Sequence, residues 1–128
     1  MKRLCFGAAT AWALHASAAC ALEPADGALL GNGPVQLAWR AEPGPVQTGK
    51  PFTVLIRLCP ADAVLTTVDA HMPEHRHGMN YRPTLQAQGG GRWRAQGLLW
   101  HMAGRWELRF DVLQAGQAHT LRQSVELP

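Results

Sequence analysis

Polar and apolar residues alternate along much of the chain with a period of two, which is typical of β-strands that have one buried face. The clearest run covers residues 105–113, in which Trp106, Leu108, Phe110 and Val112 share one side. Charged residues occupy the other side of this run, as expected for a sheet with one face in water. The strands predicted from such runs are 35–40, 52–58, 64–71, 84–88, 92–100, 105–113 and 119–127.

Glycine- and proline-rich breakers separate these runs, among them Gly31–Pro34, Glu42–Pro45 and Gly89–Gly91. No window sustains a helical period. About seven short strands with regular turn signals in roughly 100 residues predict an all-β, immunoglobulin-like β-sandwich. The predicted core comprises Phe52, Val54, Ile56, Val68, Trp93, Leu99, Trp106, Leu108, Phe110, Val112 and Val125.

Residues 1–21 have the order of features that defines a secretory signal peptide. Lys2 and Arg3 precede a short apolar run, residues 5–14, and small residues follow. Ala16-Ser17-Ala18 and Ala19-Cys20-Ala21 each fit a cleavage site. We therefore expect export to the periplasm and a folded domain over residues 22–128.

Charge and hydropathy exclude two classes of partner. The whole chain has 12 basic and 9 acidic residues, and removal of Lys2 and Arg3 leaves 10 against 9. No block of like charges is present, so nucleic-acid binding is not expected. No later apolar stretch approaches the ~18 residues that cross a membrane, so we expect no transmembrane segment in the mature chain.

The cysteines leave three possibilities open. Cys5 lies in the signal, while Cys20 lies at its end and Cys59 lies in the domain. Cys20 and Cys59 can form a disulfide in an oxidising compartment, Cys20 can be the lipidated residue of a lipoprotein signal, or Cys20 can be removed with the signal. The residue three before Cys20 is Ser17, where a lipoprotein signal usually has leucine.

A loop crowded with histidine and methionine is the distinctive feature of the chain. Residues 71–79 hold three of the six histidines and two of the four methionines. His75 and His77 are two apart, and Met79 continues the same parity, so an extended backbone would point all three to one side. A second pair, His101 and Met102, ends a predicted strand. The candidate metal ligands are Met72, His75, His77, Met79, His101 and Met102.

These donors favour copper over other metals. Soft thioethers select Cu(I), and imidazole accepts Cu(I), Cu(II) or zinc, whereas calcium and magnesium prefer oxygen ligands. Zinc, held by histidine alone, is the less favoured alternative. The chain has no nucleophile motif, zinc-protease motif or phosphate loop, so an enzyme is not expected. A solvated histidine-rich loop and methionines that only pack are the simpler interpretations.

Two motifs resemble the YtkA-like domain family, which is related to the FixH-like proteins. Met72–Met79 is similar to its M-P-x-H-x-H-G-M segment, and Leu99–Leu108 is similar to its later G-x-W-x-L pattern. The resemblance runs from Gly49 to Val112. It implies a periplasmic or membrane-anchored immunoglobulin-like domain that handles copper and supports respiratory-oxidase assembly, with the six candidate ligands as its metal residues.

One departure from the family concerns the membrane. FixH-like members carry a transmembrane helix, while this chain has the pattern of a cleavable signal. The prediction is therefore a periplasmic copper carrier or buffer in copper homeostasis, with an envelope copper-accepting protein as its partner. The alternative is a metal-free module that docks an envelope partner through its tryptophan-bearing strands and the loop residues Arg76 and Arg82.

Overall fold

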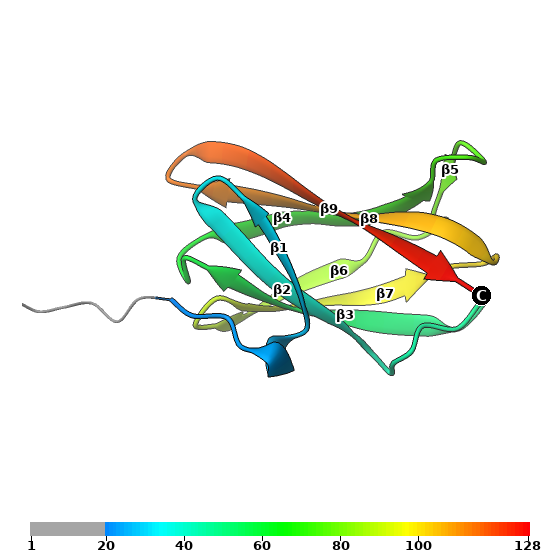
Figure 1. Cartoon of the computed structure of the whole chain (residues 1–128), viewed down its shortest axis with the longest axis horizontal. Coiled ribbons are helices and arrows are strands. Elements are labelled where there is room, and N and C mark those ends of the chain that lie inside the picture. Colours follow the sequence, from blue (N-terminus) through cyan, green and yellow to red (C-terminus); the bar gives the residue numbers. More distant parts are fainter. Residues whose placement is uncertain (1–19) are drawn as a thin grey trace, which may run out of the picture.

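The computed structural model describes residues 20–128, which form a sandwich of two antiparallel sheets (Figure 1). The predicted signal peptide therefore lies almost wholly outside the described residues. A single 3₁₀ turn, η1 (Pro24–Asp26), precedes the strands. The strands are β1 (Ala28–Asn32), β2 (Val35–Glu42), β3 (Pro51–Cys59), β4 (Val64–Met72), β5 (His77–Gly78), β6 (Thr84–Gly89), β7 (Arg92–Leu99), β8 (Gly104–Gln114) and β9 (Gln117–Leu127).

The strand order is that of an immunoglobulin-like sandwich. One sheet has the order β1-β2-β3-β7-β6 and the other β5-β4-β8-β9. Without β1 and β5, four strands face three, with the connectivity of a constant-type immunoglobulin domain. The predicted all-β class is confirmed, and the two additional strands are short. Within residues 20–128, no helix is long and apolar enough to span a membrane.

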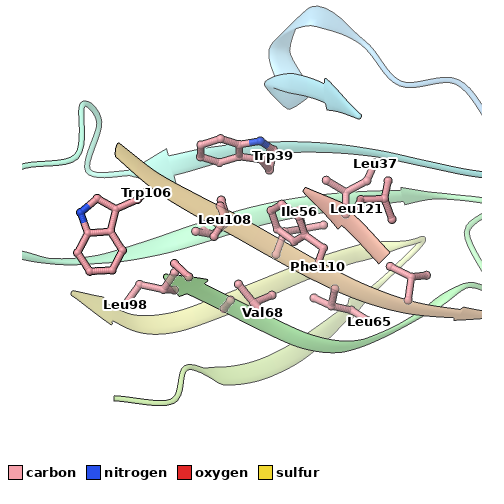
Figure 2. Packing of buried hydrophobic residues seen from close by; sticks show 14 of the residues in the cluster. Leu37, Trp39, Ile56, Leu65, Val68, Leu98, Trp106, Leu108, Phe110 and Leu121 are labelled. Carbon is pink, nitrogen blue, oxygen red and sulfur yellow. The ribbon is translucent and has the colours of Figure 1, made fainter. Parts of the chain in front are cut away.

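The core lies between the sheets and is built from alternate residues of the central strands. Figure 2 shows Trp106, Leu108 and Phe110 of β8 among the side chains of the facing sheet. Most predicted core residues are buried, but Trp93, Leu99 and Val125 are only half-buried. The core also takes in buried residues that the prediction omitted: Val35, Leu37, Trp39, Leu58, Leu65, Met72, Leu98, Trp100, Leu121 and Leu127.

A bulge at Gly97 explains why Leu99, at the end of β7, was wrongly predicted to point into the core. Thr53 pairs with Gln96 and Phe52 pairs with Leu98, so Gly97 has no partner on β3. Its φ of +88° is a conformation that glycine adopts readily. The extra residue reverses the alternation, so Leu98 and Trp100 are buried in place of Leu99.

Strand β1 was not predicted, because its sequence was assigned in part to a turn. Gly31 and Asn32 belong to β1 and pair with Gln36 and Val35 of β2. The turn itself is confined to residues 33–34. Tight hairpins need few turn residues, so a glycine- and asparagine-rich stretch can serve as both strand end and turn.

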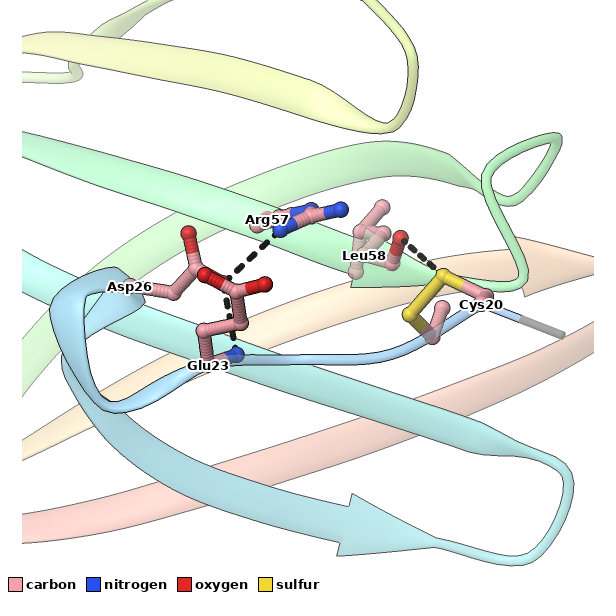
Figure 3. The surroundings of a disulfide bond; sticks show 6 residues. Cys20, Glu23, Asp26, Arg57 and Leu58 are labelled. Carbon is pink, nitrogen blue, oxygen red and sulfur yellow. Dashed lines mark hydrogen bonds and ion pairs between the residues drawn. A yellow bond between two sulfur atoms is a disulfide. The ribbon is translucent and has the colours of Figure 1, made fainter. Parts of the chain in front are cut away.

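A disulfide joins Cys20 to Cys59 at the end of β3 (Figure 3). It holds the N-terminal segment, residues 20–27, against the outer face of the first sheet. A sulfur in a disulfide cannot carry a thioether-linked lipid. The pairing therefore favours the first of the three possibilities for Cys20.

Candidate metal centre

The first histidine motif forms a tight hairpin between β4 and β5. Met72 pairs with His77 across the hairpin, and the Met72 carbonyl accepts hydrogen bonds from the amides of His75 (3.1 Å) and Arg76 (2.9 Å). Arg76 takes a φ of +54°, which lets the chain reverse. His75 therefore lies in a turn, whereas the spacing of His75, His77 and Met79 had suggested an extended backbone. The turn still brings the rings of His75 and His77 to a centroid distance of 5.7 Å.

The link between β7 and β8 brings a third imidazole to this hairpin. His101 lies in that link, and its ring centroid is 5.0 Å from that of His77 with an interplanar angle of 35°. Both segments lie at the same end of the sandwich, at the right of Figure 1. His75, His77 and His101, the His cluster, thus join the two sequence motifs. His77 is half-buried at its centre, whereas His75 and His101 are exposed.

Two stacked tryptophans form the apolar base of the His cluster. Trp106 meets the rings of His77 (6.0 Å, 71°) and His101 (5.6 Å, 83°) in edge contacts. Trp100 stacks on Trp106 at 5.3 Å with an interplanar angle of 5°. Trp106 was predicted only as core filling and Trp100 was omitted. The position of Trp100 next to His101 in the sequence is the signal that connects it to the site.

The methionines divide into two groups. Met72 is 0% exposed and belongs to the core. Met79 and Met102 are half-buried and pack against the edge of the core. The Met79 amide donates to the Ala70 carbonyl at 3.2 Å, and the Met102 carbonyl accepts from Nε1 of Trp106 at 3.0 Å. These bonds tie the backbone of both half-buried methionines to β4 and β8, the strands that lie next to the His cluster in the sequence.

Carboxylates near the loop are engaged elsewhere. Glu74 Oε1 accepts a hydrogen bond from Arg105 Nε at 2.8 Å, and this bond holds the pKa of Glu74 below its ordinary value. His71 lies on the outer face, with its Nε2 atom 3.9 Å from Glu107 Oε1. Neither Glu74 nor Glu107 forms a hydrogen bond or ion pair with a ring of the His cluster. The donors available for a metal at this end of the sandwich are therefore imidazoles and thioethers.

The spacing of the rings fits a shared metal ion, although the three rings do not form a complete ligand set. Two imidazoles on one tetrahedral ion, each with a metal–nitrogen bond of ~2 Å, have centroids about 5 Å apart. The separations of 5.0 and 5.7 Å match this value. Among residues 20–128, however, no three His, Cys, Asp or Glu side chains converge as a set that could hold an ion. A shared ion would therefore need further ligands, and thioethers would have to complete the set.

No protein-family model, no curated protein and no solved structure matches the chain. The resemblance to YtkA-like domains therefore stays a prediction that rests on the two motifs.

Proposed function

We propose that the protein is a periplasmic copper-binding protein, a carrier or buffer. The observation that carries the proposal is the contact of His77 with His101, at 5.0 Å between ring centroids, which joins the β4–β5 hairpin to the β7–β8 link. Among residues 20–128, none of the three rings forms an ion pair with a carboxylate, so charge pairing does not explain why they gather at one end of the domain. A shared ion gives that reason.

The proposed ligands are the three imidazoles of the His cluster together with the thioethers of Met79 and Met102. A nitrogen and sulfur set of this kind suits Cu(I), and the imidazoles alone suit Cu(II). Met72 is the one predicted ligand whose side chain is wholly enclosed, and we assign it to the support of the site. The half-buried methionines lie beside the apolar core, which suits soft ligands that bind Cu(I) without water.

Exposure of the site suits transfer of copper. His75 and His101 reach solvent, so a ligand from an accepting protein can replace them one at a time. The buried Trp100–Trp106 stack gives the His cluster a rigid base during such an exchange. A carrier or buffer that supplies a respiratory oxidase would work in this way.

The test is copper stoichiometry and affinity by competition with a chromogenic chelator, for Cu(I) under anaerobic conditions and for Cu(II) in air. Wild type should bind one equivalent. His75→Ala/His77→Ala and His101→Ala should each weaken binding at least tenfold, which corresponds to about 1.4 kcal/mol. X-ray absorption on the copper-loaded protein should count both sulfur and nitrogen neighbours.

His71→Ala is the matched control, because His71 lies on the same hairpin but faces Glu107. It should retain wild-type affinity. Unchanged binding in the double variant would end the proposal. Binding of zinc that is indifferent to Met79→Leu and Met102→Leu would replace it with a histidine-only zinc site.

The alternative, a metal-free docking module, has one observation in its favour. Tyr81 is 59% exposed beside the exposed Arg82, next to the His cluster hairpin. Trp39, Trp100 and Trp106 are buried, so they are not available to a partner. Copper-independent capture of an envelope protein that Tyr81→Ala abolishes would support this role.

A further inference from the structure

A polar pocket of about 420 Å³ lies on the outer face of the first sheet, beside the N-terminal segment. Four arginines line it: Arg40, Arg57, Arg92 and Arg94. They come from β2, β3 and β7 and represent four of the ten basic residues in 22–128. The only acidic residues in its lining are Glu23 and Asp26. The pocket therefore concentrates positive charge in a part of the chain that is otherwise nearly neutral.

The strand register places these arginines against each other. Arg57 of β3 is directly opposite Arg92 of β7. One row further along, Leu55 lies between Arg40 of β2 and Arg94 of β7. Like charges opposite each other on one face destabilise a sheet. Arg57 and Arg92 form such a pair, and Arg40 and Arg94 add two more positive charges in the neighbouring row, a cost that folding alone does not explain.

The carboxylates nearby compensate only part of this charge. Arg57 Nη1 donates to Asp26 Oδ2 at 2.9 Å, as Figure 3 shows, and Arg92 Nη1 is 3.9 Å from Asp26 Oδ1. Arg94 has a loose contact with Glu42 at 3.8 Å. Within residues 20–128, Arg40 has no ion pair. In the same part of the chain, the buried Nε atom of Arg57 has no hydrogen-bond partner.

We propose that this arginine pocket binds a compact anion through a phosphate or carboxylate group. Guanidinium groups form paired hydrogen bonds with both of these groups. Arg40 and Arg94, which share a row, are the arms that would hold the ligand. Asp26, which contacts both Arg57 and Arg92, would orient these two arginines in the pocket. A dianion would balance the two positive charges that the lining leaves over.

The pocket is independent of the proposed copper site. It lies toward the Cys59 end of β3, whereas the His cluster lies at the end of the sandwich near Leu99. One wall is residues 23–26, which the Cys20–Cys59 disulfide holds in place. Reduction of that disulfide should therefore weaken anion binding, while the loss of histidine ligands should leave it unchanged.

The experiment is a titration of the purified, disulfide-bonded protein with inorganic phosphate and, separately, with citrate. Calorimetry and amide chemical shifts monitor the binding. Saturable binding should appear with shifts at 40, 57, 92 and 94. Arg40→Gln/Arg94→Gln should weaken it at least tenfold, since hydrogen bonds to charged groups contribute ~1.5–3 kcal/mol. Arg109→Gln is the matched control, because Arg109 pairs with Asp111 on the other sheet.

Vesicles that contain phosphatidylglycerol separate the two sources of such a group. Arginine-dependent binding to vesicles without binding of free phosphate or citrate would assign a lipid headgroup, and the reverse would assign a soluble anion. A melting temperature of Arg40→Gln/Arg94→Gln that is equal to or higher than that of wild type would show that the variant is folded. Binding that Arg109→Gln weakens as much as the double variant, or no binding of any of the three probes, would overturn the proposal.

Discussion

The methyl group of Met72 lies 2.8 Å from the position that a Cβ atom on residue 104 would occupy. Met72 ends β4 in the first motif, and Gly104 begins β8 in the second. The two motifs are therefore packed together beneath the His cluster. A Cβ atom at 104 would force the end of the Met72 side chain to move, and the φ of +123° at Gly104 is a conformation that other residues avoid.

Gly104→Ala should lower the free energy of unfolding by about 1–3 kcal/mol, because it adds backbone strain and a clash with Met72. Thermal and urea unfolding would measure this loss. Gly116→Ala is the comparison, since Gly116 also has a positive φ but has open space around it. In a double-mutant cycle with Met72→Ala, the Gly104→Ala penalty should shrink as the methyl is removed. Strict additivity would show that Met72 and Gly104 are not coupled.

Substitution of the methionines should separate core packing from copper binding. Met72→Leu keeps the volume of a buried side chain and should cost less than ~1.5 kcal/mol while Cu(I) affinity stays near wild type. Met79→Leu and Met102→Leu should lower Cu(I) affinity and leave Cu(II) affinity less affected. Chelator competition with both oxidation states checks this. Equal losses of Cu(I) affinity in all three variants would show that Met72 is also a ligand.

Copper should quench the fluorescence of Trp106. The indole is 6.0 Å from His77 and 5.6 Å from His101 between ring centroids, so an ion held by these rings lies within quenching distance. Titration with Cu(II) should end at one equivalent, and Trp106→Phe should remove most of the response. His119→Ala, at the opposite end of β9, should leave it intact. A response that persists fully in Trp106→Phe would place the ion elsewhere.

Reduction of the Cys20–Cys59 disulfide should destabilise the domain by about 3–4 kcal/mol. The two cysteines are 39 residues apart, and a loop of this size restricts the unfolded chain by roughly that free energy. Unfolding with and without reductant gives the value, and Cys59→Ser should match the reduced wild type. Intact mass of the protein isolated from its native cells should show that Cys20 is retained. A mature chain that begins after Cys20 would contradict this expectation.

The free energy of unfolding should depend on pH in the acid range because of Asp26. The Glu23 amide and then Arg57 donate to this carboxylate and hold its pKa below the ordinary value. A lowered folded-state pKa adds stability above the unfolded-state pKa of about 4, and this stability is lost as pH falls through the folded-state pKa. Asp26→Asn should therefore cost about 1 kcal/mol at pH 7 and almost nothing near pH 2. A cost that is independent of pH would contradict this assignment.

The strands were predictable where alternation is strict. In β8, each inward residue from Trp106 to Val112 is buried, because one face of the strand meets the opposite sheet. Prediction was wrong where one residue breaks the period. Gly97 shifts the end of β7 by one position, and only the pairing with β3 shows that the shift occurs there.

The candidate site was predictable as a set of residues but not as an arrangement. His75, His77 and His101 could be selected from the sequence, because histidines are rare and the identity of a side chain is known without the fold. It did not separate the enclosed Met72 from Met79 and Met102, because burial depends on which strand packs above each side chain. The Trp100–Trp106 base was likewise not predictable without the bulge that turns Trp100 inward.

The sequence by itself determined the class of the fold, since alternation and turn residues act over a few neighbours along the chain. It also determined which side chains offer the imidazole and thioether donors from which a metal site is proposed. Only the tertiary structure decided that His77 meets His101, that Cys20 pairs with Cys59, and that four arginines share one pocket. Each of these depends on strand register across a sheet or on the packing of two sheets, which joins residues that no local pattern relates.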